Sequence, residues 1–216
     1  MPISYFLKNS GQSLSHWALA SCAVCMLTMP AQAQSQSNAA PNRQQVGNAQ
    51  GGFAKQVTVG GSALQLNGSG IRYKAIFKVY NMALYTSSKV ASAEEAIALR
   101  GSKRLDFVAL RELPGTDLGV LFLRGMKDNS PIEQINKHLA SSNRLIEIFS
   151  GRSKLMPGDT FSMDYSPGKG TTFYIQGVAQ GASVGDDEFF AMVLKIWLGP
   201  IPADHKLKDA LLGTAA

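Results

Sequence analysis

Residues 71–85, IRYKAIFKVYNMALY, constrain the fold of this chain more than any other segment. Side chains alternate between the two faces of a β-sheet, so the odd and even positions of this segment can be considered separately. The odd positions are almost all apolar or aromatic. The even positions carry three cations, Arg72, Lys74 and Lys78, and then Tyr80 and aliphatic side chains. The alternation predicts one long strand with one cationic end, and therefore a sheet as the framework of the fold.

Turn and helix signals elsewhere predict further strands and several helices. Residues 57–66 alternate around Gly60-Gly61 and predict a hairpin, Asn67-Gly68-Ser69-Gly70 is interpreted as a tight turn, and a second hairpin is expected over residues 160–177. A further strand is expected over residues 104–111, and helices over residues 93–100, 117–126, 131–149 (capped by Ser130), 188–198 (capped by Asp186-Asp187) and 202–213 (starting at Pro202). Strands near both ends with helices between them indicate the α+β class, an antiparallel sheet backed by helices.

The first 33 residues have the pattern of a secretory signal peptide. Lys8 is the only charged side chain there, and a mostly apolar run over residues 16–29 precedes the small-residue site Ala31-Gln32-Ala33. The run is shorter than the roughly 20 apolar residues of a transmembrane helix. A lipoprotein processing site at Cys22 is the alternative, but the apolar run continues past that cysteine.

The chain is therefore expected to have three parts. Residues 1–33 form the signal peptide, cleaved after Ala33, and leave no transmembrane segment. Residues 34–52, rich in Gln, Asn, Ala and Gly, form a flexible leader. Residues 53–216 form the folded domain of a periplasmic or secreted protein.

Residues that usually carry metal or nucleotide chemistry are scarce. Two cysteines and three histidines exclude a zinc ribbon, a disulfide scaffold and an iron–sulfur site as organising features. His138 and His205 are interpreted as ordinary, partly exposed histidines, and neither a metal site nor a cofactor is expected. The formal net charge is +6, but the basic residues are scattered without interleaved aromatic side chains, which argues against nucleic-acid binding.

The even side of residues 71–85 remains as the candidate site. If that side faces solvent, the segment is an ordinary amphipathic strand, and Lys74 and Lys78 are most simply explained in this way. If helices cover it, the cationic end can hold a carboxylate or phenolate and the apolar end its carbon skeleton. Arginine is the better anchor, because a guanidinium binds a carboxylate bidentately and stays charged when buried. Arg72 and Tyr80 are therefore candidate ligand-binding residues.

Six motifs, in order and with plausible spacing, resemble the chalcone isomerase-like family. They are GSGIR (68–72), FKVYNMALY (77–85), LRELPG (110–115), MPGD (156–159), LKIWLG (194–199) and LKDALLG (207–213), the last similar to the exported bacterial branch. The resemblance covers nearly all of residues 55–213. It implies an open-faced β-sandwich, in which helices cover one face of a large antiparallel sheet and a ligand cleft lies between them.

The resemblance also implies what the family's enzymatic site has become in this chain. In the enzymes an arginine stabilises a flavonoid phenolate, while Thr, Tyr, Asn and a second Thr or Ser hold the substrate. These positions fall on Arg72, on Tyr80, on Leu118, on Gly125 and near Ile196. The last three have no hydrogen-bonding side chain, and a buried phenol or ketone would lose partners worth about 1–3 kcal/mol each. True chalcone isomerase activity is therefore not expected.

The same substitutions favour an apolar cleft with a cation at one end. The expected ligand-binding residues are Arg72, Tyr80, Leu118, Phe122, Gly125 and Ile196. The first hypothesis is a non-catalytic exported protein that binds a fatty acid or a similar apolar anion. One alternative is an isomerase or intramolecular lyase of chalcone isomerase type that uses Arg72 and Tyr80 on an unknown substrate. Another is a closed-core protein with a periplasmic protein partner, in which Arg72 makes an ordinary salt bridge.

Overall fold

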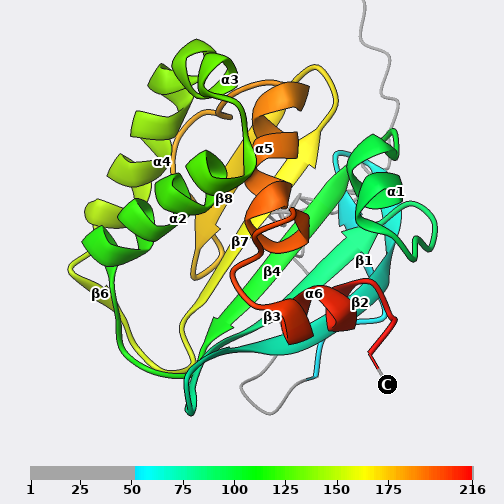
Figure 1. Ribbon diagram of the computed structural model, residues 1–216, viewed down its shortest axis with the longest axis horizontal. Helices are drawn as coiled ribbons and strands as arrows, with labels where there is room; N and C mark the ends of the chain where they lie inside the picture. The colour runs from blue at the N-terminus through cyan, green and yellow to red at the C-terminus, as the bar shows by residue number, and fades with distance from the viewer. Residues whose placement is uncertain (1–51, 216) are drawn as a thin grey trace, which may run out of the picture. The chain divides into compact units, whose positions relative to one another are not determined.

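The computed structural model describes residues 52–215, which contain a seven-stranded antiparallel sheet in the order β1-β2-β3-β4-β7-β8-β9 and a two-stranded ribbon of β5 and β6 (Figure 1). The strands are β1 (Gln56–Val59), β2 (Ser62–Lys74), β3 (Phe77–Thr86), β4 (Lys103–Ala109), β5 (Leu113–Pro114), β6 (Lys154–Leu155), β7 (Thr160–Ser166), β8 (Gly170–Ile175) and β9 (Val178–Ala179). The helices are α1 (Ala93–Ala98), α2 (Gly115–Asn129), α3 (Ile132–Lys137), α4 (Leu139–Ser150), α5 (Asp187–Leu198) and α6 (His205–Leu211).

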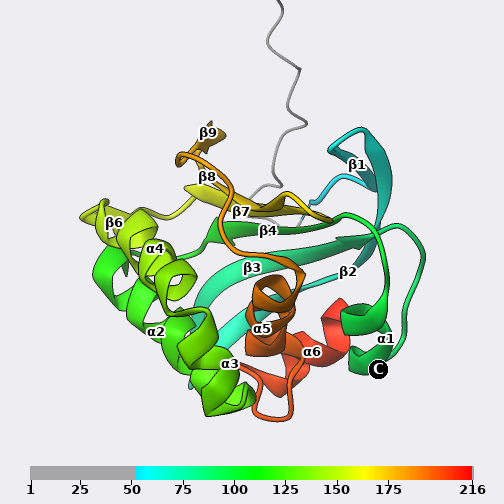
Figure 2. The same ribbon diagram turned by 90° about the horizontal axis from the view of Figure 1, so that it is seen from above.

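Helices α1 to α6 lie on one side of the sheet (Figure 2). The main core fills the space between the two layers, and aromatic side chains dominate its centre. Phe107 and Phe161 of the sheet stack with their ring centroids 4.1 Å apart, and Phe122 of α2 and Trp197 of α5 pack around them. The α+β class and the sheet covered on one face by helices are both confirmed. The predicted hairpins over residues 57–66 and 160–177 are also confirmed.

The single strand predicted over residues 71–85 is wrong, because the chain reverses at Ala75 and Ile76 and forms the β2–β3 hairpin. Ala75 has a φ of 53°, a left-handed conformation that non-glycine residues rarely adopt. No glycine, proline, asparagine or aspartate marks this turn, so the pattern gave no signal for it. The predicted shared face nevertheless holds for Arg72 and Tyr80, because they are direct cross-strand partners.

The tight turn predicted at Asn67-Gly68-Ser69-Gly70 is also wrong, since these residues continue β2. Helix α6 packs directly against the two glycines. A Cβ atom at Gly68 would collide with the carbonyl oxygen of Ala210, and one at Gly70 would lie 2.7 Å from the Ala210 Cβ. The buried Asn67 side chain secures the same contact by donating to the Leu211 carbonyl at 2.7 Å. The glycines therefore allow a close helix–sheet approach.

Several helix boundaries differ from the prediction. The helix expected over residues 131–149 is interrupted at His138, whose φ of −104° and ψ of 24° separate α3 from α4. The expectation that His138 is partly exposed is also wrong, because its side chain is buried and hydrogen-bonded to Glu188. Pro131, not Ser130, occupies the N-cap position of α3, with no capping side chain. The last helix begins after Asp204 and not at Pro202, because the Asp204 carboxylate accepts hydrogen bonds from the first backbone N–H groups of α6.

The expected signal peptide over residues 1–33, its alternative at Cys22 and the expected leader up to residue 51 lie outside the described residues. Within residues 52–215, no helix combines the length and the apolar character needed to cross a bilayer.

Candidate functional site

A cleft lies between the β2–β3 hairpin and α2, next to the loop that joins α5 to α6. It consists of two adjoining hollows of about 180 and 320 Å³ that share Arg72, Lys74, Leu118 and Leu121. We call the two together the Arg72 cleft. Small-molecule sites usually have volumes of roughly 300–1,000 Å³, so the cleft has the size of a site for a small ligand.

All six expected ligand-binding residues line the larger hollow. Arg72 comes from β2 and Tyr80 from β3, while α2 contributes three residues and α5 contributes Ile196. The three from α2 are Leu118, Phe122 and Gly125. Their spacing of three and four residues places them on the inward face of that helix, which explains why periodicity could identify them.

Arg72 is a half-buried cation with unused hydrogen-bonding capacity. Its Nε is buried without a hydrogen-bond partner, and no carboxylate in residues 52–215 lies within ion-pair distance of its guanidinium. The guanidinium carbon lies 5.6 Å from the ring centroid of Tyr80, at one end of the cleft. Buried donors are normally paired, so the unpaired Nε leaves this cleft-lining guanidinium with capacity for an acceptor. The ordinary salt bridge considered for Arg72 is absent from the described part of the chain.

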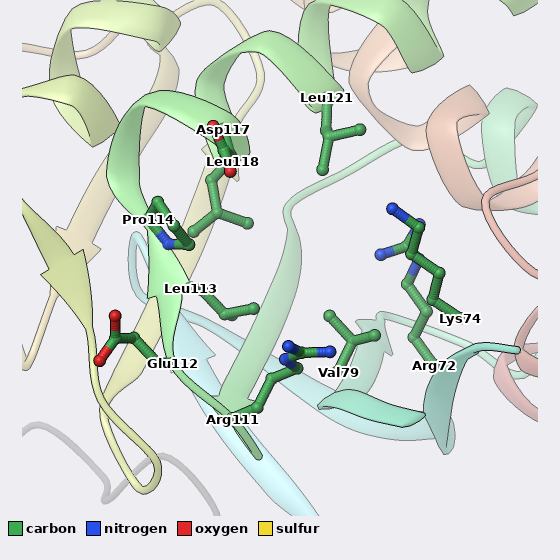
Figure 3. A pocket seen from close by; sticks show the side chains of 10 residues that line it. All are labelled: Arg72, Lys74, Val79, Arg111, Glu112, Leu113, Pro114, Asp117, Leu118 and Leu121. Atoms are coloured by element: carbon green, nitrogen blue, oxygen red, sulfur yellow. The ribbon is translucent and has the colours of Figure 1, made fainter. Parts of the chain in front are cut away.

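Two further cations approach the smaller hollow. Arg72 and Lys74 extend from β2 toward α2, opposite Leu118 and Leu121, and Arg111 approaches from the chain after β4 (Figure 3). This end of the cleft therefore combines several cations with an aliphatic wall. Lys74, interpreted from the sequence as an ordinary solvent-facing residue, is exposed as expected but also belongs to the cleft lining.

The carboxylates of the lining are mostly engaged with other cations. Glu112 accepts a hydrogen bond from Lys154 at 2.8 Å, and Asp128 lies 3.7 Å from Arg124 on the same helix. Asp117, in the first turn of α2, is the remaining acidic side chain of the lining. Three cations and one carboxylate without such a partner leave the cleft with a net positive charge, which favours an anion.

Tyr80 forms part of the floor of the cleft, and a hydrogen bond from Trp197 holds its hydroxyl group in place. The Trp197 Nε1–H donates to the Tyr80 hydroxyl oxygen at 2.7 Å. Burial raises the pKa of Tyr80 to about 12, although Arg72 and the Trp197 hydrogen bond oppose the rise. A general acid or base works best with a pKa near the working pH, so this phenol is poorly suited to proton transfer near pH 7.

Aromatic side chains close the inner end of the cleft. The Tyr80 ring lies edge-on to Phe107 at 5.4 Å, and Phe122 packs against Trp197 at 5.7 Å. A Cβ atom at Gly125 would lie only 2.9 Å from the Ile196 Cγ2, so α2 and α5 are in direct contact there. The positions that the resemblance matched to the asparagine and the second threonine of the enzymes are therefore filled by a helix–helix contact.

Most of the lining residues were not among the sequence-predicted site residues. Those that matter most for a ligand are Lys74, Arg111 and Leu121. Leu121 lies on the apolar face expected for its helix, but it is 41% exposed and faces the cleft. Arg111 ends the predicted strand over residues 104–111, and only the tertiary structure brings it opposite β2. For these residues the sequence showed a charged or apolar side chain, but it did not show that the side chain lies at the cleft.

The fold and cleft together define the class of this protein: an α+β domain with helices on one face of an antiparallel sheet and a cationic, partly apolar cleft between them. A family model described as chalcone isomerase-like matches residues 45–213, and the chain belongs to this family. A crystal structure of a fatty-acid binding protein from Arabidopsis thaliana is similar, with a TM-score of 0.58 and 16% identity, over 77% of this chain and 94% of that chain. This likeness shows a common fold. The search of curated proteins found no match.

Proposed function

We propose that this protein is an exported, non-catalytic member of the chalcone isomerase-like family that binds a fatty acid or a similar apolar anion in the Arg72 cleft. The observation that carries the proposal is the Arg72 guanidinium, whose Nε is buried without a partner beside an apolar wall. A carboxylate supplies the missing acceptor, and a hydrocarbon chain suits the aliphatic wall.

The cleft suggests how such a ligand would lie. Its carboxylate would accept charge-assisted hydrogen bonds from Arg72, with Lys74 and Arg111 adding positive charge. Its chain would run along α2 over Leu118 and Leu121, and the exposed Leu121 would gain from losing contact with water. The fatty-acid binding protein with the same fold supports this ligand class.

Export is the second part of the proposal and rests on the N-terminal sequence. A basic residue, an apolar run over residues 16–29 and the site Ala31-Gln32-Ala33 have the order of a cleavable secretory signal. The protein would then act in the periplasm or outside the cell. N-terminal sequencing of protein recovered from the periplasm tests this, and an intact residue 1 in all recovered protein would contradict it.

The ligand proposal is tested by identifying what the protein carries. The protein is purified without detergent and denatured, and the released small molecules are identified by mass spectrometry. The Arg72→Gln variant is compared with Arg152→Gln, which alters an exposed arginine outside the cleft lining. A titration with a soluble fatty acid gives the dissociation constants. Loss of hydrogen bonds to a charged group predicts about 10- to 100-fold weaker binding for Arg72→Gln and no change for Arg152→Gln.

The outcomes separate the alternatives. A stoichiometric apolar acid that disappears in Arg72→Gln supports a carrier anchored by that residue. An empty protein that also fails to bind fatty acid in the titration contradicts the proposal and favours the closed-core partner protein. Cyclisation of an enone substrate that depends on Arg72 would instead favour an isomerase.

A further inference from the structure

The tip of the β2–β3 hairpin presents apolar side chains to solvent. Ile76 is 84% exposed, Phe77 is 56% exposed and Tyr73 is 40% exposed. Figure 1 shows this turn projecting beyond one end of the sheet. Ile76 is the most exposed large apolar side chain in residues 52–215. Exposed apolar side chains that cluster on one feature usually mark an interaction surface.

Three cations lie around this apolar tip, together with one carboxylate, that of Asp204, which accepts a hydrogen bond from the Tyr73 N–H at 2.8 Å. Lys74 and Lys78 flank the turn in the two strands, and the Arg111 guanidinium lies 5.4 Å from the ring centroid of Phe77. Residues 52–93, which include all of β1, β2 and β3, contain no aspartate or glutamate. Glu112, next to Arg111 in sequence, is hydrogen-bonded to Lys154. The tip therefore combines apolar side chains with positive charge, which complements a bilayer with anionic headgroups over hydrocarbon.

The backbone of the turn is unfavourable in itself. Ala75 adopts a φ of 53° without the freedom of glycine, and the reversal places Ile76 at the extremity of the hairpin. Backbone strain of this kind concentrates at functional positions. Here the strained turn holds the Ile76 side chain in water, where that side chain makes no stabilising contact within the folded protein.

We propose that the hairpin tip, residues 73–78, docks on an anionic phospholipid membrane. Ile76 and Phe77 enter the boundary between headgroups and acyl chains, while Lys74, Lys78 and Arg111 contact lipid phosphates. Lys74 belongs both to the tip and to the Arg72 cleft, so docking brings the cleft to the bilayer surface. Docking needs no ligand in the cleft. Docking could also serve to pass an apolar anion between the membrane and the cleft, and only this role rests on the proposed function.

The test is flotation of the purified protein with vesicles of phosphatidylcholine, with and without phosphatidylglycerol. Every variant is prepared with the same N-terminus, so that residues 1–51 contribute equally. The docking variants are Ile76→Ser and Lys78→Gln, neither of which lines the cleft, and the matched controls are Val178→Ser and Lys169→Gln. Val178 is 61% exposed and belongs to β9 at the far edge of the sheet, and Lys169 is an exposed cation in the β7–β8 turn.

The expected result is binding that requires phosphatidylglycerol. Ile76→Ser weakens the partition coefficient about tenfold and Lys78→Gln roughly fivefold, while Val178→Ser and Lys169→Gln leave it unchanged. Ile76→Ser retains full affinity for a fatty acid in solution, so failure of docking and failure of the cleft proposal are distinguishable.

Three results would overturn the proposal. The first is equal binding of Ile76→Ser and wild-type protein, and the second is equal loss in the controls. The third is a vesicle-free dimer, measured by sedimentation equilibrium, that Ile76→Ser abolishes, since that result assigns the tip to a second copy of the chain.

Discussion

Replacing Tyr80 by phenylalanine tests the floor of the cleft directly. The Tyr80 hydroxyl is the acceptor of the Trp197 Nε1–H at 2.7 Å, and both side chains are buried. Tyr80→Phe keeps the ring and its packing against Phe107 but leaves a buried donor unpaired. Leaving a buried polar group unpaired costs about 1–3 kcal/mol. We therefore expect the free energy of unfolding at pH 7 to fall by that amount.

At high pH the same substitution has a second, opposite effect on the free energy of unfolding relative to wild type. The pKa of Tyr80 is raised from 10.0 to about 12 in the folded protein, chiefly by burial. The stability linked to this raised pKa is fully present below pH 10 and is lost as the pH rises through 12. For this shift, ionisation of Tyr80 removes roughly 1 kcal/mol by pH 11 and roughly 2 kcal/mol by pH 12. Tyr80→Phe lacks this loss, so the two proteins converge in stability at alkaline pH.

The assay is guanidinium chloride unfolding at a series of pH values from 7 to 12, followed by tryptophan fluorescence. Tyr85 and Tyr165 also have raised pKa values because of burial, so both proteins lose stability at high pH and only their difference reports on Tyr80. Tyr85→Phe, which leaves the Trp197 hydrogen bond intact, is the control for the loss of stability at pH 7. Parallel stability curves for wild type and Tyr80→Phe across this range would refute the assignment of a buried, neutral phenol.

Two further predictions concern stability and are measured by the same denaturation at pH 7. Ala75→Gly is expected to raise the free energy of unfolding by about 0.5–1 kcal/mol, because relief of a left-handed backbone worth about 1–2 kcal/mol exceeds the greater unfolded-state entropy of glycine; a loss of stability would show that the turn is unstrained. Asn67→Ala is expected to cost about 2–4 kcal/mol, because the Asn67 side chain donates to the Val90 and Leu211 carbonyls and accepts from the Val90 N–H. A change within about 0.5 kcal/mol would exclude this role.

The sequence predicted what depends on local periodicity and caps. The hairpin around Gly60-Gly61 and the helix behind Asp186 were recognisable because turn glycines and capping carboxylates act within a few residues. The inward face of α2 was recognisable because Leu118 and Phe122 recur at helical spacing. The predicted site residues followed from the same patterns together with the family motifs.

Elements that depend on distant partners were predicted wrongly. The reversal at Ala75 is imposed by cross-strand pairing and not by turn chemistry, so the alternation continued through it unbroken. Gly68 and Gly70 were interpreted as a turn. They are glycines because α6 packs closely against them, and that helix lies about 140 residues further along the chain. Ser130 was expected to cap a helix, but Pro131 takes that position in the folded chain.

The sequence by itself determined the fold class and the shared face of Arg72 and Tyr80, but it left open whether helices or solvent cover that face. Arg72 and Tyr80 are both even positions of residues 71–85. Although the chain reverses between them, the register pairs them directly, so their side chains still lie on the same face of the sheet. Only the tertiary structure decided that Arg72 lacks an ion pair, that Arg111 joins it, and that aromatic packing closes the inner end of the cleft. These features are set by distances between residues far apart in the chain, which local patterns of polarity do not encode.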